Sequence, residues 1–341
     1  MGELGAAMGS SGESLFEAFL NRHGDKAWRE IVHTLLPSIH EVDRTATEIW
    51  FYFFPLALLR ALDQADLREQ LAKRLSLEGS FLLEDQIDSS HEFLYGHRYW
   101  TRVKAAVSEL AASTNAPASL DLAAQICGVA SKVAGEAQVD ASCVVGITAV
   151  AFMTLQQVGA AAFKSAPGAV RKLSEKSPEQ ILKDRARDDK QPFLVSLFNP
   201  DKIFSINFDE RDPAAKFKLI NTQHLTTAAA NDKRDYHSRD PRCVMGEGPI
   251  PIQCRSAACG TCWVGVLAGA EKLSEVAGLE WRKITEFGYI DTDEPRPLIR
   301  LACQAQAFGN VTIVIPPWNG VFGKFIRAQQ GASEEEESPA I

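Results

Sequence analysis

Several common functional signatures are missing from the sequence, and each absence excludes a class of protein. No Gly-x-Gly-x-x-Gly follows a predicted strand and no phosphate-binding loop is present, so nucleotide and flavin binding lack support, and a reductase with flavin and nicotinamide modules is disfavoured. The haem-attachment motif Cys-x-x-Cys-His is also absent. The N-terminus carries neither a basic segment followed by an apolar core nor a twin-arginine signal. We therefore expect a cytoplasmic protein whose cysteines remain reduced, which argues against disulfides.

A strong charge of either sign is lacking outside the C-terminal tail. The formal net charge is −8, and part of it comes from the four consecutive acidic residues Glu334 to Glu337. Within residues 193–327, 16 Lys and Arg stand against 15 Asp and Glu, and the basic residues are dispersed. This balance predicts no nucleic-acid surface, and it does not favour long-range attraction to a basic partner.

Two long apolar runs test the cytoplasmic expectation. Residues 49–59 are too few to span a bilayer and contain Pro55, whereas residues 141–163 are long enough and uncharged but contain Gln156 and Gln157. We interpret both runs as buried helices. Membrane contact is left open as an alternative.

The N-terminal half has the pattern of helices without convincing strands. Ser14 is a candidate cap for a first helix and Asp25 for a second, and residues 81–112 are predicted to form one or two further helices. We expect a disordered segment over residues 1–12 and an all-α helical bundle over residues 13–165. Ser177 and Gln180 form a capping-box pattern, which predicts one helix in a linker over residues 166–192.

After this linker the hydrophobic period changes from helical to strand-like. The turn at residues 199–202 predicts a β-hairpin, residues 226–230 and 279–287 are predicted helices, and residues 263–267 and 311–315 are predicted strands. The expected fold class is therefore α+β, with a second domain over residues 193–327 and an acidic disordered tail over residues 328–341.

Four of the seven cysteines are spaced like the ligands of an iron–sulfur cluster. Cys254, Cys259 and Cys262 form Cys-x4-Cys-x2-Cys, and Cys303 precedes a second apolar strand. Thiolates suit iron, and this spacing is that of the plant-type [2Fe–2S] site. A tetrathiolate zinc site is a weaker alternative, because it normally uses two short cysteine pairs and here the fourth cysteine stands alone.

Residues 193–317 resemble the plant-type [2Fe–2S] ferredoxins and the ferredoxin-like domains of larger redox proteins, through the phrases C-R-x-x-x-C-G-x-C and R-L-A-C-Q. The resemblance implies a β-grasp domain, in which a four- or five-stranded sheet packs on one helix, and one-electron transfer. It also implies four cluster ligands: Cys254, Cys259, Cys262 and Cys303. Two features depart from the family pattern, namely Ala257 in place of a common Gly and the long interval between the third and fourth cysteines.

The other three cysteines are not expected to bind the cluster. Cys243 lies near the motif, but four ligands already fill the site, so we interpret it as a spare thiol. Cys127 and Cys143 fall within predicted helices.

Histidines in the helical half raise the possibility of a second metal or haem centre. The four are His33, His40, His91 and His97. Glu30-x-x-His33 has the spacing used in di-iron bundles, and Asp88-x-x-His91 is the nearest second pair. Haem ligation by His40 or His97 is a further alternative, and structural or surface roles are favoured for all four.

Three functions follow from this sequence. The first is an electron carrier with a [2Fe–2S] cluster that exchanges single electrons with protein partners of unknown identity, and whose helical domain serves docking or homo-oligomerisation. The second is a redox enzyme in which the helical domain binds its own haem or di-iron centre. The third is a subunit of a larger membrane-attached redox complex, with residues 141–163 at the interface.

Overall fold

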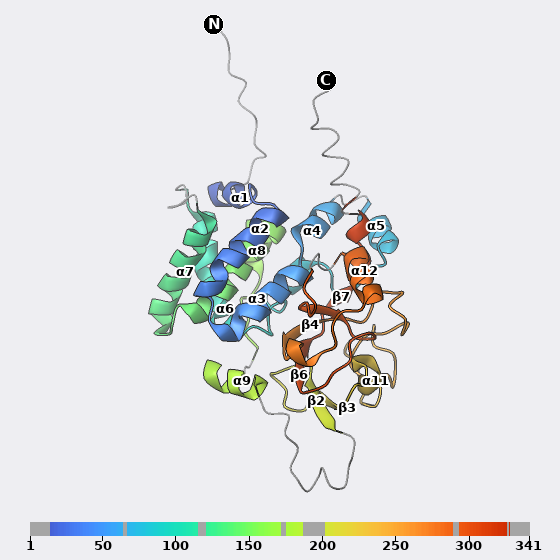
Figure 1. Cartoon of the computed structure of the whole chain (residues 1–341). Coiled ribbons are helices and arrows are strands. Elements are labelled where there is room, and N and C mark those ends of the chain that lie inside the picture. Colours follow the sequence, from blue (N-terminus) through green and yellow to red (C-terminus); the bar gives the residue numbers. More distant parts are fainter. Residues whose placement is uncertain are drawn as a thin grey trace.

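The computed structural model describes residues 14–63, 67–114, 121–171, 175–186, 202–288, 293–325 and 327. Most helices of the N-terminal part occupy one side of the molecule, and the sheet occupies the other together with α5 (Arg68–Arg74), α11 (Leu225–Ala229) and α12 (Gly278–Phe287) (Figure 1). The expected disorder at residues 1–12, the acidic tail, and the first arm of the predicted hairpin with most of its turn lie outside the described residues.

Eight helices are described in the N-terminal part, and a ninth, α9, follows them. Their bounds are α1 Leu15–Leu20, α2 Asp25–Leu35, α3 Glu41–Phe53, α4 Leu56–Leu62, α5 Arg68–Arg74, α6 Trp100–Ala112, α7 Leu122–Ala137, α8 Ser142–Ser165 and α9 Pro178–Arg185. Helix α8 lies at the centre and packs against α1, α3, α6 and α7. Its residues 143–155 are all buried, as expected of a helix that is apolar on every face.

Helix α8 is also the one described helix whose length and composition would allow it to cross a membrane. Seventy-two per cent of its most apolar window is buried inside the protein. The expectation that residues 141–163 form a buried helix therefore agrees with the packing. The other apolar run is divided at Pro55 between α3 and α4.

Side-chain capping explains where several helices begin. Ser14 and Glu17 form a capping box at α1, and Ser177 and Gln180 form the predicted one at α9. The expectation that Asp25 caps the second helix is wrong, because Gly24 occupies that position. The Asp25 carboxylate instead accepts a 2.9 Å hydrogen bond from the backbone N–H of Leu56 at the start of α4.

The predicted helix over residues 81–112 is also wrong in its first part. Short 3₁₀ turns at Leu83–Gln86 and Tyr95–Tyr99 precede α6, which begins at Trp100. The buried carboxylate of Asp43 on α3 accepts hydrogen bonds from the backbone N–H groups of Tyr95 (2.6 Å) and Gly96 (2.7 Å). These tertiary bonds hold the backbone in an irregular path that local sequence does not predict.

The C-terminal part contains a five-stranded mixed sheet in the order β3-β2-β6-β4-β5. The strands are β2 Ile203–Asn207, β3 Lys216–Ile220, β4 Trp263–Ala268, β5 Ile299–Leu301 and β6 Val311–Val314. Strand β2 pairs with β6 in parallel, and the other pairs are antiparallel. Helices α11 Leu225–Ala229 and α12 Gly278–Phe287 complete this part. The predicted strands β4 and β6 and both predicted helices are confirmed, and the fold class is α+β.

One large hydrophobic core runs through both halves, and a small second cluster groups Val42, Tyr95 and Cys143. The ring of Phe53 on α3 lies 5.1 Å from that of Trp263 on β4, with an edge-to-face angle of 79°. Gly265 permits this approach, because a Cβ atom there would lie 2.6 Å from Ile49 on α3. One indole hydrogen bond joins the halves further, because Trp318 Nε1 donates to the Phe53 carbonyl at 2.7 Å. A second, from Trp263 Nε1 to the Trp318 carbonyl at 3.0 Å, links β4 to Trp318 within the sheet half.

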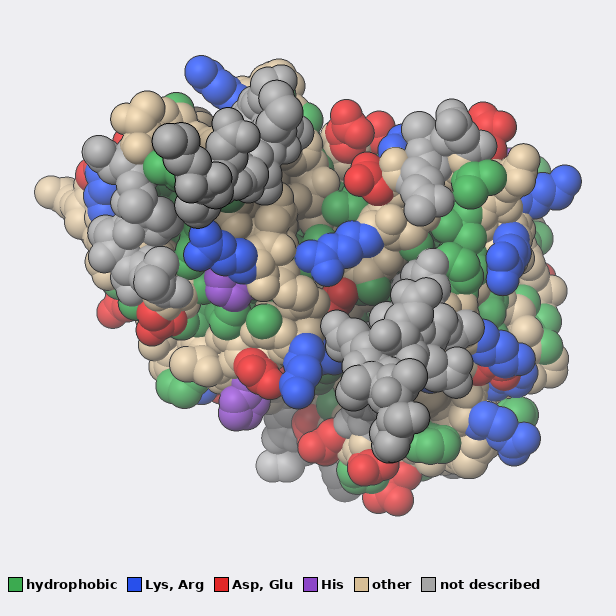
Figure 2. Space-filling view, turned by 90° about the horizontal axis from the view of Figure 1, so that it is seen from above, with side chains coloured by type: hydrophobic (Ala, Val, Ile, Leu, Met, Phe, Trp, Pro, Cys, Tyr) green, Lys and Arg blue, Asp and Glu red, His purple; other side chains and the backbone are tan. Residues whose placement is uncertain are grey.

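A second, two-stranded sheet adds to this junction. Strand β1 Glu78–Gly79 pairs antiparallel with β7 Trp318–Asn319, although no strand was expected within residues 13–165. We call the Phe53–Trp263–Trp318 contacts and this sheet the seam. On the described part of the face in Figure 2, basic and acidic side chains are interspersed, in keeping with the near balance of charge in the sequence.

Candidate iron–sulfur site

The four predicted cysteines lie at the ends of two adjacent strands and in the loop that leads to them. Cys262 immediately precedes β4, and one residue, Ala302, separates the end of β5 from Cys303. Because β4 and β5 pair antiparallel, with Trp263 opposite Leu301, the start of one strand lies beside the end of the other. A hydrogen bond from the Ala302 N–H to the Cys262 carbonyl, 2.9 Å long, fixes this juxtaposition.

The thiols form two pairs. Cys262 and Cys303 are hydrogen-bonded to each other and almost fully buried, with 1% and 4% exposure. Cys254 and Cys259 are also hydrogen-bonded to each other and are half-buried. Two thiol pairs, one buried and one near the surface, are therefore held within one loop and one strand end.

Each pair contains a thiol whose pKa is lowered. The hydrogen bond from Cys262 lowers the pKa of Cys303 to about 6, and the same interaction together with burial raises the pKa of Cys262. Burial raises the pKa of Cys254, but hydrogen bonds from the Ser256 backbone, from Cys259 and from the Ala258 backbone outweigh it and bring the value to about 7. Thiolate is the form in which cysteine binds a metal, so both pairs are prepared for ligation.

Several donors surround the sulfur atoms. The Ala258 N–H donates to Cys254 Sγ at 3.3 Å, and the Gln304 amide donates to Cys303 Sγ at 3.4 Å. The Thr261 hydroxyl lies 3.1 Å from Cys259 Sγ. Such donors stabilise negative charge on sulfur and orient the ligands.

The path of the loop depends on two residues with left-handed backbone conformation. Gly260 has φ of 74°, and a Cβ atom there would lie 3.1 Å from the Phe287 ring of α12. Ala257 has φ of 57° although it carries a Cβ atom, which costs about 1–2 kcal/mol relative to a relaxed conformation. The Ala257 N–H is directed at Cys303, whose pKa it lowers. The Ala at this position therefore keeps the loop conformation for which Gly is the usual residue.

A buried ion pair supports the strand that delivers Cys303. Arg300 on β5 and Glu280 on α12 have side chains 0% and 1% exposed. Arg300 Nε and Nη2 donate to the two carboxylate oxygens of Glu280 at 2.8 and 2.9 Å, and the Leu301 N–H donates to the same carboxylate at 2.9 Å. Arg300 Nη1 also donates to the Ser274 carbonyl at 2.7 Å. The conformation of the strand end before Cys303 thus depends on this pair, which sequence reasoning did not identify.

The other three cysteines do not belong to the two thiol pairs, and burial raises the pKa of each. Cys243 is buried and donates from Sγ to the Pro249 carbonyl at 3.3 Å, and burial raises its pKa to about 12. Burial likewise raises the pKa of Cys143 in α8 to about 11, and it also raises the pKa of Cys127 in α7.

The candidate residues of the helical half either lie at the surface or have structural partners. Glu30 and His33 lie on the exposed face of α2. His40 accepts a hydrogen bond from the Val42 N–H and caps α3. Asp88 accepts from the Trp100 indole and from the backbone of residues 168 and 169.

His91 and His97 meet as a buried pair, with Nδ1 atoms 2.9 Å apart. His91 Nε2 lies 3.2 Å from the Ile87 carbonyl, which can only accept, so this nitrogen carries the proton. The Nδ1 of His91 then accepts from His97 Nδ1, and His97 Nε2 has no hydrogen-bond partner among the described residues. Burial lowers the pKa of both imidazoles, that of His97 to about 4.

Within the described ranges, no three His, Cys, Asp or Glu side chains gather where they could hold a single metal ion. A [2Fe–2S] cluster does not require such a group, because its two irons share four cysteines, two to each iron. The two thiol pairs fit that requirement.

Comparison with known proteins agrees with this geometry. Residues 244–307 match the family model described as a 2Fe-2S iron-sulfur cluster binding domain. The matched segment contains all four cysteines of the two pairs, and it binds a [2Fe–2S] cluster. No solved structure matches the chain.

Proposed function

We propose that this protein is an electron carrier whose ferredoxin-like domain has the β-grasp fold and holds one [2Fe–2S] cluster through Cys254, Cys259, Cys262 and Cys303. The observation that carries the proposal is the pairing of the four thiols at one end of β4 and β5. The five-stranded mixed sheet with its associated helices supports the β-grasp assignment.

The burial of the four cysteines suggests which iron each would bind. Cys254 and Cys259 would hold the iron nearer the surface, and Cys262 and Cys303 would hold the buried one. The bound cluster supplies one-electron chemistry. The protein's contribution is to provide thiolates, to direct N–H groups at sulfur and to exclude water from the inner pair.

A partner protein is proposed to dock at the outer pair. Arg255 and Ala258 are exposed in the cluster loop, and Arg255 forms an ion pair with Glu247. Met245, two residues before Glu247 in the chain, is 78% exposed. An apolar contact rimmed by paired charges suits a partner that is recognised by shape rather than by long-range charge. The helical half is proposed to contribute docking or homo-oligomer surface.

Iron, acid-labile sulfide and haem analysis of anaerobically purified protein, with visible spectra before and after dithionite, tests the proposal. We expect two irons and two sulfides per chain, bleaching on reduction and no Soret band. Extra iron or a Soret band would instead favour the redox-enzyme alternative.

Cysteine variants test the ligand assignment. Cys303→Ser is expected to lose the cluster and to destabilise the domain, because ligand binding and folding are coupled. Cys243→Ser is the matched control, since among the described residues its buried thiol donates to a backbone carbonyl, that of Pro249, and it should keep full iron content. An unchanged spectrum in Cys303→Ser would contradict the assignment.

A further inference from the structure

A cavity of about 200 Å³ lies between the helical half and the sheet half. Its walls come from α3, the irregular segment before α6, helix α9, the turn after β2, and strands β4 and β6. It is separate in sequence from the cluster loop, and none of the four cysteines lines it. Drug-sized ligands usually occupy pockets of about 300–1,000 Å³, so this cavity suits a molecule of one or two rings.

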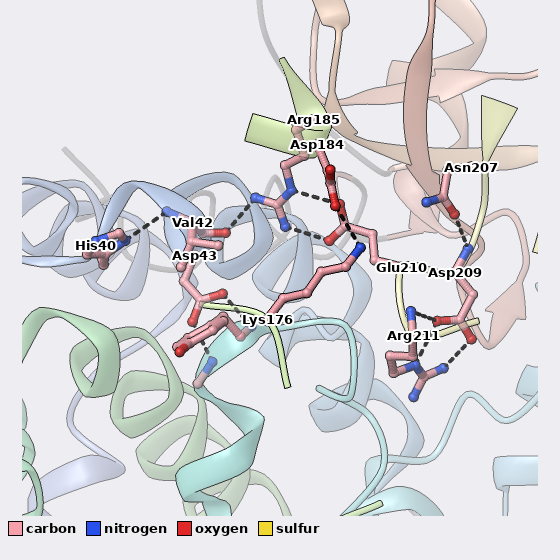
Figure 3. A network of polar contacts seen from close by, with 12 residues as sticks. His40, Val42, Asp43, Lys176, Asp184, Arg185, Asn207, Asp209, Glu210 and Arg211 are labelled. Atoms are coloured by element: carbon pink, nitrogen blue, oxygen red, sulfur yellow. Dashed lines mark hydrogen bonds and ion pairs between the residues drawn. The ribbon is translucent and has the colours of Figure 1, made fainter. Parts of the chain in front are cut away.

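One wall of the cavity is charged, and its charges cancel. It contains three arginines and three carboxylates, namely Arg98, Arg185, Arg211, Glu92, Asp209 and Glu210. Figure 3 shows the core of this network. Arg185 donates to both oxygens of Glu210 at 2.8 Å and to the Val42 carbonyl at 2.7 Å.

The remaining arginines of this wall are engaged as well. Arg211 donates to both oxygens of Asp209, at 2.7 and 2.8 Å, and also to Glu92. Arg98 lies 3.5 Å from the centre of the Tyr95 ring. Because every carboxylate of the wall is matched by an arginine, the wall favours a neutral ligand over an anion. A guanidinium carries five N–H groups, more than the three that Arg185 uses in the bonds named above, so the wall can also donate to an acceptor on the ligand.

The rest of the lining is largely apolar and aromatic. It includes Phe53, Phe93 and Phe208 together with aliphatic side chains of β4 and β6. Flat aromatic side chains favour a planar ring in the ligand.

Ring contacts connect this part of the lining to the cluster loop. The Phe93 ring lies 5.9 Å from that of Phe53, which lies 5.1 Å from that of Trp263. Trp263 directly follows the proposed ligand Cys262. A ligand in the cavity would thus be in contact with an aromatic series that ends at the residue next to a proposed cluster ligand, which favours a redox-active molecule over an inert one.

We propose that this cavity binds a small neutral quinone. Quinones are planar, uncharged, redox-active and bear carbonyl acceptors, so they match both parts of the lining and the position beside the aromatic series. The inference rests on the proposed electron-transfer function for the choice of a redox-active ligand, whereas the binding site itself is defined by the cavity.

Isothermal titration of the cluster-containing protein with duroquinone tests the site. This one-ring quinone has no free ring position for addition of thiols. We expect saturable binding of one molecule per chain. Ile181→Trp and Ile315→Trp place an indole at two different half-buried positions of the lining, and each should weaken binding at least tenfold. Ile220→Trp is the matched control, because Ile220 is 45% exposed at the end of β3 and does not line the cavity.

Three results would overturn the proposal: no saturable binding to the wild-type protein, equal affinity in the folded lining variants and the control, or tighter binding of benzoate than of duroquinone. Circular dichroism identifies a variant that has not folded, and the second lining variant then decides. Iron content and the visible spectrum are recorded on the same samples. A protein without a cluster would refute the electron-transfer function, whereas a cluster-containing protein without quinone binding would refute only the cavity site.

Discussion

The ion pair between Arg300 and Glu280 provides the most demanding prediction. Both side chains are essentially inaccessible, and the carboxylate accepts three hydrogen bonds, two from Arg300 and one from the Leu301 N–H. Removing one partner leaves the other charge buried without compensation, which typically costs about 3–5 kcal/mol. Glu280→Gln retains one acceptor for Leu301, and Arg300 retains the Ser274 carbonyl. We therefore expect a loss near the lower end, about 3 kcal/mol.

Arg300→Met should cost a similar amount, because it leaves Glu280 as an unpaired buried anion. The double variant Glu280→Gln/Arg300→Met contains no buried charge at this position. It should therefore be more stable than the sum of the two single effects implies, by about 2 kcal/mol or more. This coupling separates the pairing of charges from the simple loss of packing.

Anaerobic urea titrations followed by far-UV circular dichroism give the free energies of unfolding, and visible absorbance reports the cluster in the same sample. Since Leu301 lies two residues before Cys303, absorbance should be lost at lower urea in both single variants than in the wild type. The reasoning is refuted if either single variant loses less than about 1 kcal/mol, or if the two effects are additive.

Two further predictions concern the loop and the buried histidines. Gly260→Ala should lower stability by about 1–2 kcal/mol in thermal unfolding, because its Cβ would meet the Phe287 ring in a left-handed conformation, whereas Gly278→Ala, where nothing lies within 4 Å, should not. The pKa of His97 is about 4 in the folded protein and near 6.5 in the unfolded chain. Its contribution to the free energy of unfolding is therefore fully present above pH 6.5 and is lost as the pH falls towards 4, by up to about 3 kcal/mol. Burial raises the pKa of Asp43 to about 6, so protonation of this carboxyl favours the folded protein as the pH falls and opposes the effect of His97. The free energy of unfolding must therefore be measured for the wild type and for His97→Asn at each pH. Parallel curves of this free energy against pH would contradict the lowered pKa of His97.

The sequence predicted the features that depend on local pattern. Helix α8 was evident from its uninterrupted apolar composition, and α9 from Ser177 and Gln180. The cysteine spacing indicated the cluster, which the match of residues 244–307 supports. Strand β3 was missed although its signal was present, since Phe217 and Leu219 are buried between exposed neighbours in strict alternation.

Other features could not have been found from one sequence. Strand β5 has three residues, too few for a period to be recognised. The irregular path of residues 81–99 depends on Asp43, more than 50 positions away from Tyr95 in the chain. The partnership of Glu280 with Arg300 likewise joins residues 20 positions apart through the packing of a helix on a strand. Contacts of this kind arise only after the elements have assembled, and no local propensity encodes them.

The seam fixes the position of the helical half relative to the proposed cluster site. Domains joined only by a linker move relative to one another unless a large hydrophobic interface restrains them, and the rate of an encounter between them then depends on the tether. Here Trp318 and the β1–β7 pair fix the helical half against the strand that follows Cys262. A partner held by the helical half would therefore meet the cluster at one constant separation, and delivery of an electron would involve no diffusional search by a swinging domain.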